Sequence, residues 1–211
     1  MEEDSDLAYR IARSFVGSRF GADTKKFVPA DDMERIITVE NIKKEFEYGS
    51  DNADEELTDL ISFVNMKATK LFAIAIYSGM DGSTLIDAMK LFKAQDFTDE
   101  NLPVRPWKDG ETHQLTLLGG PWKKQQRIRL FCIHQWAFLA PIFTAATETL
   151  FSYDLERSHV LPFIEKYEEG FQRGAFGQVY KYKIHPSHLR DPENPVEHPR
   201  LGKDEESLTS L

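Results

Sequence analysis

The residues best suited to chemistry form a glycine-rich stretch, RGAFGQVYKYK, at positions 173–183. Gly174 and Gly177 have no Cβ, so the backbone around them can approach a phosphate group without a steric clash. Phe176 precedes the second glycine, and Val179 follows it by two positions. The combination predicts a turn between two strands that covers the phosphates of a nucleotide.

The stretch resembles the glycine-rich loop of eukaryotic protein kinases, whose pattern is G-x-G-x-x-G-x-V. Residues 174–179, GAFGQV, match the second half of that pattern, while Gln172 stands in place of the first glycine and Gly170 lies nearby. The resemblance runs from Leu161 to about His188 and implies ATP with Mg²⁺ as a ligand, although the chain itself requires no cofactor. The residues that it assigns to ATP are Gly174, Ala175, Phe176, Gly177 and Val179. An unrelated glycine-containing hairpin is the alternative interpretation.

The region before this stretch is similar to the helical leader that precedes the kinase domain in filamentous-fungal protein-kinase-like proteins. The similarity lies in four segments, VPADDMERIIT, KLFAIAIY, FTDENLP and FCIHQWAFLAPIF. It covers more of the chain than the glycine-rich stretch does. These segments suggest no chemistry of their own.

Phosphoryl transfer in the kinase family requires an A-x-K lysine after the glycine-rich loop, an H-R-D aspartate and a D-F-G aspartate. No A-x-K follows Val179, and neither H-R-D nor D-F-G occurs in the sequence. Lys203 is a poor substitute for the lysine because its flanks are charged rather than strand-like. The segment HLRDPEN, which begins at His188, has the wrong internal spacing for a catalytic loop. It also starts only eleven residues after Gly177, too soon for the rest of a small lobe. The sequence therefore predicts no catalytic residue.

Three other groups of residues could in principle react or bind a metal. Cys132 and His134 have the types of a nucleophile and its base, but nothing supplies an orienting third group, so a buried apolar cysteine is the preferred interpretation. His185 and His188 have H-x-x-H spacing without the further ligands that zinc needs. The acidic residues Asp96, Asp99 and Glu100 are interpreted as a helix cap and first turn, or as loop solvation. No metal site is predicted.

Composition excludes several functional classes. The formal net charge of −9 argues against nucleic-acid binding, and the basic residues at 123, 124, 127 and 129 are interpreted as a solvated face. A single cysteine and an acidic N-terminus without an apolar core predict a reducing, intracellular location, cytoplasmic or nuclear. The longest apolar run, residues 71–77, is too short to cross a membrane.

Apolar periodicity predicts the elements that must position these residues. A stripe at spacings of three and four predicts one long helix from Leu57 to Gly79. Thr38 is expected to cap a helix over residues 39–47, and Thr84 with Asp87 to open another over residues 85–92. Pro29 is placed in the first turn of a further helix, before Asp31 and Asp32. Pro141 is expected to break any helix in the aromatic-rich segment, and a short strand is expected near residues 115–118.

The predicted fold is mainly α, with a helical N-terminal region and an aromatic-rich covering segment, followed by a short β-hairpin and a disordered tail. The boundaries are a helical domain at 1–95, an irregular connector at 96–127, the aromatic segment at 128–160, the kinase-like hairpin at 161–188 and the tail at 189–211. The strands are expected at residues 163–167 and 178–185.

These observations predict a truncated protein-kinase-like chain that serves as a helical interaction or regulatory module without catalysis. Its partner would be an unidentified protein, with no nucleic acid and no membrane. The alternative is a member of the Ser/Thr protein kinase family that binds ATP and whose catalytic remainder lies outside this chain.

Overall fold

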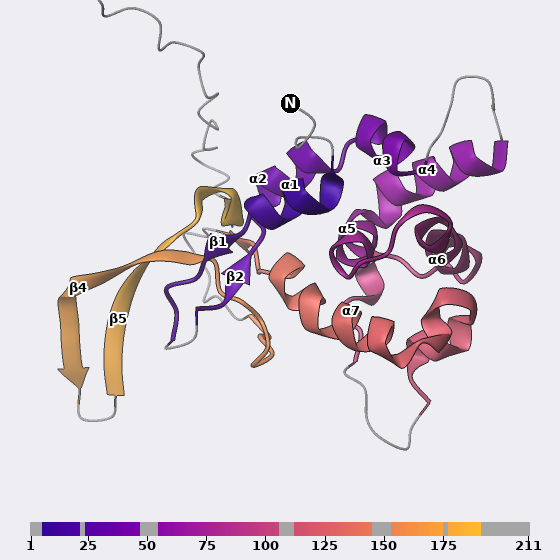
Figure 1. Cartoon of the computed structure of the whole chain (residues 1–211). Coiled ribbons are helices and arrows are strands. Elements are labelled where there is room, and N and C mark those ends of the chain that lie inside the picture. The colour runs from indigo at the N-terminus through magenta and orange to yellow at the C-terminus, as the bar shows by residue number, and fades with distance from the viewer. Residues whose placement is uncertain are drawn as a thin grey trace, which may run out of the picture.

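A computed structural model describes residues 6–21, 24–46, 55–105, 112–144, 153–174 and 177–190, with only the backbone described over 168–174 and 177–179. It confirms the predicted fold class: the chain is mainly helical, with a short β-hairpin. Figure 1 shows the helices packed together on one side of the molecule and the hairpin on the other. The predicted tail beyond Arg190 lies outside the described residues.

The N-terminal part alternates short helices with a small two-stranded sheet that the sequence did not predict. Its elements are α1 (Leu7–Arg13), β1 (Val16–Gly17), β2 (Lys26–Phe27), α2 (Ala30–Ile36) and α3 (Val39–Glu45). The predicted cap at Thr38 is confirmed, because its hydroxyl accepts a hydrogen bond from the Asn41 amide at 3.3 Å. Pro29 occupies the N-cap of α2 rather than its first turn.

The long helix predicted from Leu57 to Gly79 is wrong, because the chain bends by 100° between α4 (Glu55–Lys67) and α5 (Thr69–Tyr77). Ala68 leaves helical geometry at the bend, with φ −136° and ψ 29°. The Thr69 hydroxyl donates to the Val64 carbonyl at 3.2 Å, and the amides that open α5 donate to Asp99. Side-chain bonds at the bend therefore interrupt a helix that apolar periodicity alone would continue.

The next helix, α6 (Gly82–Ala94), begins earlier than the predicted cap at Thr84. Its N-cap residue is Asp81, which makes no side-chain cap bond. The capping box occurs further along, at Thr98 and Asn101 of the short 3₁₀ helix η1 (Asp99–Asn101).

The connector contains 3₁₀ turns, and the strand predicted near residues 115–118 is wrong. The turns are η1, η2 (Gln114–Leu118) and η3 (Gly120–Lys123). In a strand, neighbouring side chains would point to opposite faces. Here His113 instead caps a tight turn, because its ring accepts a hydrogen bond from the Leu115 amide at 3.1 Å. Gly119 then ends this turn at φ 78°, a conformation that glycine adopts without strain.

The helix α7 (Gln125–Phe138) closes the helical body and ends before Pro141, as predicted. Its Gln135 is fully buried and holds the connector, accepting from the Val104 amide at 2.7 Å and donating to the Val104 carbonyl at 2.8 Å. Aromatic rings fill the space between α6, η3 and α7: Phe92 and Trp122 lie 5.0 Å apart, and Trp122 meets Phe131 edge-on at 5.3 Å. The body thus has a close-packed core.

The hairpin follows, and its two strands are confirmed: the first is longer than expected, and the second is displaced by one residue toward the N-terminus. They are β4 (Phe163–Gly174) and β5 (Gly177–Ile184), paired antiparallel. The short turn η4 (Pro186–His188) then leads into β6 (Leu189–Arg190), which pairs in parallel with β3 (Phe143–Thr144).

Candidate functional site

The glycine-rich turn closes the free end of the hairpin. The register pairs Gly174 with Gly177, Arg173 with Gln178 and Gln172 with Val179. Ala175 and Phe176, the two residues between the glycines, lie outside the described residues, and the side chain of Val179 is not described. The strand pairing therefore brings together Gly174 and Gly177, the two glycines that were predicted to bind ATP.

The opposite end of the hairpin, its base, is held against the β1–β2 sheet. The Arg19 amide donates to the Phe163 carbonyl at 2.6 Å, and the Ser18 hydroxyl donates to the Leu161 carbonyl at 2.7 Å. The Phe163 ring stacks on Tyr182 at 4.9 Å, and Phe20 packs against both rings. These contacts make the hairpin base continuous with the N-terminal part of the chain.

A second, smaller apolar cluster lies beneath this base. Its buried members come from three distant parts of the sequence: Phe27 on β2, Ala140 after α7, and Val160 before β4. Trp136 and Ile164 pack against them. The path of the chain into the hairpin is thus fixed by packing on the helical body.

Two described lysines of the hairpin contact aromatic rings across the strands, and a third, Lys183, lies 3.9 Å from the Glu165 carboxylate. Lys166 lies 3.8 Å from the centroid of the Tyr180 ring, and Lys181 lies 5.2 Å from that of Tyr167. Such cation–π contacts attract the ammonium groups toward the ring faces. Figure 1 shows the glycine-rich end of the hairpin directed away from the helices. The described helices therefore supply no opposing wall for a nucleotide at this turn.

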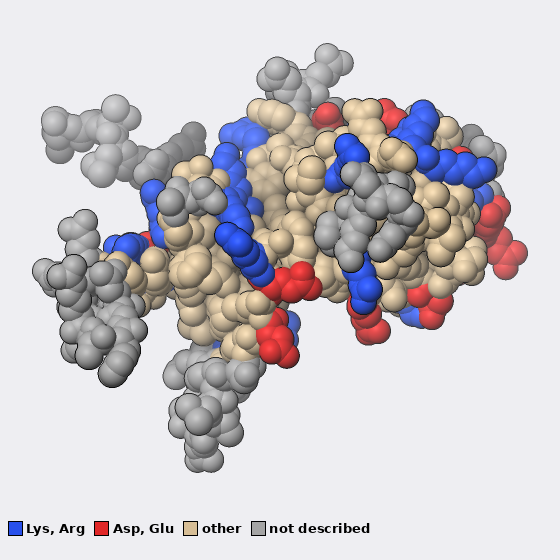
Figure 2. Space-filling view, turned by 90° about the horizontal axis from the view of Figure 1, so that it is seen from below, with Lys and Arg blue, Asp and Glu red and all other residues tan. Residues whose placement is uncertain are grey.

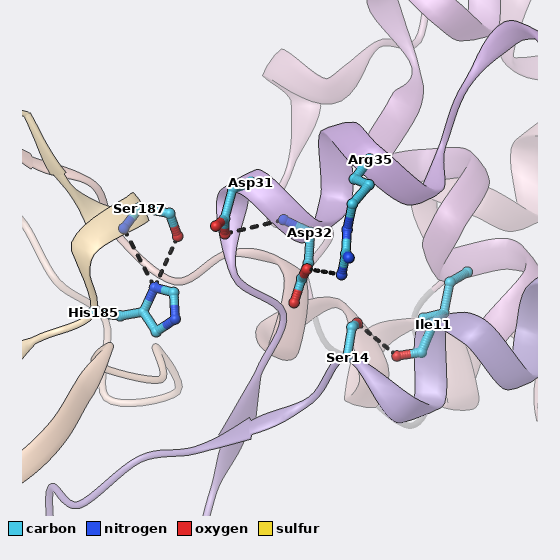
Figure 3. A network of polar contacts seen from close by, with 7 residues as sticks. All are labelled: Ile11, Ser14, Asp31, Asp32, Arg35, His185 and Ser187. Atoms are coloured by element: carbon cyan, nitrogen blue, oxygen red, sulfur yellow. Dashed lines mark hydrogen bonds and ion pairs between the residues drawn. The ribbon is translucent and has the colours of Figure 1, made fainter. Parts of the chain in front are cut away.

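A serine, a histidine and an aspartate meet where η4 touches α2 (Figure 3). His185 Nδ1 lies 2.9 Å from the Ser187 hydroxyl and accepts from the Ser187 amide at 3.3 Å. Burial acts to raise the pKa of Asp31, but hydrogen bonds from Ser187 and Asp32 and the field of His185 outweigh it and hold that pKa below its ordinary value.

The order of these three groups is wrong for nucleophilic catalysis. In a catalytic triad the imidazole lies between the hydroxyl and the carboxylate, so that it can take the hydroxyl proton. Here the Ser187 hydroxyl lies between His185 and Asp31. The arrangement caps η4 and ties it to the first turn of α2.

Cys132 lies beside His113 rather than acting with His134. Its Sγ is 3.6 Å from His113 Nε2, but that nitrogen also lies 2.6 Å from the Arg105 carbonyl. Since His113 Nδ1 accepts the Leu115 amide, Nε2 carries the proton in the neutral ring and cannot take one from the thiol. Burial raises the pKa of Cys132 to about 11, so the thiol is an inert core group, as predicted. His134 instead bonds Ser78 at 3.1 Å.

His185 and His188 both pack edge-on against the Phe27 ring. The buried His188 ring meets Phe27 edge-on at 5.2 Å, and its Nδ1 lies 3.0 Å from the Pro141 carbonyl. Within the described ranges, no three His, Cys, Asp or Glu residues lie close enough to hold a metal ion. The pair thus serves the junction between the hairpin and the body.

Asp99 lies in η1 but caps the N-terminus of a different helix, α5. Its two carboxylate oxygens accept from the Lys70 and Leu71 amides at 2.9 Å each, which satisfies the N-terminus of α5. Burial raises the pKa of Asp99 even though these bonds favour the charged form. The sequence suggested a cap, but a partner some thirty positions away is visible only in the fold.

Sequence reasoning missed the contacts that anchor the hairpin, because Ser18, Arg19 and Phe20 have no motif that marks them. In the part of the chain that the structure describes, no single helix is long and apolar enough to cross a membrane; α4 and α5 reach that length only together, across their 100° bend. Comparisons with known protein families, with curated proteins and with solved structures find no match to this chain.

Proposed function

We propose that this chain is a non-catalytic helical interaction module that carries a protein-kinase-like glycine-rich hairpin. The observation that carries the proposal is the asymmetry of the hairpin. Its base is bonded to the helical body through Ser18 and Arg19, while its glycine-rich end points away from the helices (Figure 1). A projecting element on a well-packed body is suited to contact a partner protein.

The chemistry of the residues supports the same proposal. A kinase holds the phosphates with a strand lysine and the magnesium ions with acidic and amide side chains. Of the described hairpin lysines, Lys166 and Lys181 face aromatic rings and Lys183 pairs with Glu165. The sequence has no A-x-K after Val179, and no H-R-D or D-F-G motif. The chain therefore lacks the groups that would use a bound nucleotide.

The alternative proposal is ATP binding by a chain of the Ser/Thr protein kinase family. The pairing of Gly174 with Gly177 favours it, because it puts a residue without a Cβ on each side of the turn. On this alternative the hairpin would still cover the phosphates of ATP, and the lysine and the magnesium ligands would come from outside this chain.

A thermal-shift titration with Mg-ATP separates the two proposals. A ligand that binds only the native state raises the apparent stability, so the interaction module is expected to show no change in Tm at millimolar Mg-ATP. If a shift occurs, the decisive variant is Gly177→Val, which adds a branched side chain to the turn. The matched control is Gly17→Val, since a Cβ at Gly17 meets nothing within 4 Å.

Loss of the shift in Gly177→Val, with the shift kept in Gly17→Val, would establish nucleotide binding at the hairpin and overturn the first proposal. A shift that both variants keep would place the nucleotide elsewhere and leave the hairpin without that role.

A further inference from the structure

A small basic pocket lies at the base of the hairpin, between the β1–β2 connection and the residues that lead into β4. Its volume is about 160 Å³. The lining residues come from two segments far apart in the sequence: Ser18, Phe20, Gly21 and Lys25 from the first, and Arg157, His159, Val160 and Leu161 from the second. Among the described residues that line the pocket, none carries a carboxylate.

Three of the lining side chains can donate hydrogen bonds to an anion. Among the described residues, neither Lys25 nor Arg157 pairs with a carboxylate. His159 Nδ1 accepts from the Glu156 amide at 2.9 Å, so in the neutral ring the proton lies on Nε2. The pocket therefore combines an ammonium, a guanidinium and an imidazole N–H.

Contacts within the chain hold other parts of the pocket wall in place. The Ser18 hydroxyl donates to the Leu161 carbonyl at 2.7 Å and accepts from the Phe20 amide at 3.2 Å. The Trp136 ring meets His159 edge-on at 5.2 Å, which holds the imidazole in place. Preorganised walls lower the conformational cost of binding.

A comparison with the other basic groove shows why this pocket is the better anion site. The groove between α1 and α2 is lined by Arg10, Arg13 and Arg35, but Asp32 lines it too and is paired with Arg35. All three arginines lie in the last turns of their helices, where the negative end of the helix dipole opposes an anion. The pocket at the hairpin base has neither disadvantage.

Figure 2 shows a line of Lys and Arg side chains on the face between the hairpin side and the helical body. The chain as a whole carries a formal charge of −9, which repels a polyanion such as nucleic acid. A single compact anion is different, because it needs only a local positive field. The pocket is large enough for one tetrahedral oxyanion with its five heavy atoms.

We infer that this pocket binds a phosphate group through Lys25, Arg157 and His159. A phosphate monoester carries nearly two negative charges at neutral pH and three acceptor oxygens. These match the three donors, and a guanidinium can bind two of the oxygens at once. The source of the group is either free phosphate or a phosphorylated side chain of a partner protein.

Binding would join the β1–β2 connection to the segment just before β4. Both segments already hold the hairpin base through Ser18 and Leu161. A bound phosphate would therefore stabilise the junction. This inference goes beyond the proposed interaction role and does not depend on whether the glycine-rich turn binds nucleotide.

The test is a titration of the full chain, followed by NMR, in buffers of constant ionic strength balanced with chloride. One arm uses inorganic phosphate, and the other uses N-acetyl-O-phosphoserine methylamide. We expect saturable shifts of the Lys25 and His159 signals in at least one arm. Binding in both arms identifies a pocket that accepts a phosphorylated side chain, whereas binding of inorganic phosphate alone identifies free phosphate as the ligand.

Charge-neutral variants assign the binding to the pocket. Lys25→Gln and Arg157→Gln each remove one charged donor and are expected to weaken binding by about tenfold or more. Lys123→Gln makes the same charge change at an exposed residue of η3, outside the pocket, and is expected to leave the affinity unchanged. Both pocket side chains are exposed, so neither change should unfold the chain.

Failure of both probes to bind the unaltered chain would overturn the inference. Equal weakening by Lys123→Gln and Arg157→Gln would also overturn it, because a general charge effect would then explain the titration. Neither result bears on the Mg-ATP experiment at Gly177, so the two proposals can fail separately.

Discussion

The helical body and the β-hairpin are stabilised in different ways. In the body, Phe92, Trp122 and Phe131 have no exposed surface and contact one another ring to ring. In the hairpin, the described rings at the base are only partly buried, and Tyr180 is 40% exposed. The body has its own core, whereas the hairpin is stabilised by the surface on which its base rests.

This difference implies a hierarchy of stability. A two-stranded hairpin is marginal in water, because it buries little apolar area against the entropy that it loses. The contacts of Ser18, Arg19 and Phe20 with the hairpin base supply what the hairpin lacks. We therefore expect changes in the body to unfold the whole chain, and changes at the junction to release the hairpin first.

The largest effect is expected for Trp122→Ala in the body. Removing a fully buried indole leaves a cavity, and the free energy of unfolding should fall by about 3–5 kcal/mol. Urea denaturation measures the loss. The control is Trp122→Phe, which keeps a ring and removes an indole N–H that has no hydrogen-bond partner among the described groups. An equal loss in both variants would show that cavity formation is not the cause.

The next effect is expected for Asp99→Ala, which removes the cap of α5. Two helix amides lose their acceptor, so the free energy of unfolding should fall by about 1–2 kcal/mol. The exposed neighbour Glu100 provides the matched control, Glu100→Ala. A loss as large in the control would count against the capping role.

An effect of similar size, but confined to the hairpin, is expected for Phe163→Ala at the hairpin base. The variant loses the stack on Tyr182 and the edge contact with Phe20, which should lower the opening free energy of the hairpin by about 1–2 kcal/mol. Hydrogen exchange at Tyr167 and Lys181 should become faster, while exchange in α5 stays unchanged. Ile133→Ala, at a residue that is 66% exposed on α7, is the control. Faster exchange in both regions would contradict the hierarchy.

The smallest effect is expected from acidification. Burial lowers the pKa of His188 and that of His134, so the folded state binds protons less readily than the unfolded chain does. Stability is therefore complete above the ordinary histidine pKa of about 6.5, and it decreases as the pH falls below that value toward the lowered pKa. Between pH 7 and pH 5 the loss should be below about 1 kcal/mol for each group.

Urea midpoints measured across this pH range test the prediction. His134→Gln should reduce the pH dependence of the body, and His188→Gln should reduce that of hairpin opening. The backbone of Pro141 and the carboxyl of Asp31 oppose the shift at His188, and His185 adds to it. A pH dependence that neither variant reduces would show that carboxyl groups control it instead.

Local sequence signals predicted several elements well. Thr38 marks its helix because a β-hydroxyl next to the first turn accepts an orphan amide. Pro141 follows the end of α7, and the alternation in residues 180–184 marks a strand. Signals of this kind depend on neighbours within a few positions, so the sequence displays them directly.

Other predictions failed because the deciding partner is distant. The helix from Leu57 to Gly79 divides at Ala68, where the cap that opens α5 comes from Asp99. The segment near Leu115 forms a 3₁₀ turn rather than a strand, held by His113. Apolar periodicity cannot distinguish one helix from two that share a core, since both bury the same residues.

The sequence alone determined the mainly helical class, the hairpin and the glycine-rich turn, because periodicity and glycine spacing are local properties. Only the tertiary structure decided that the base of the hairpin rests on the β1–β2 sheet and that Lys25 and Arg157 line one pocket. No sequence pattern predicts that residues 25 and 157 lie close together. It arises because Phe27, Ala140 and Val160 bury a common apolar surface and bring their neighbours together.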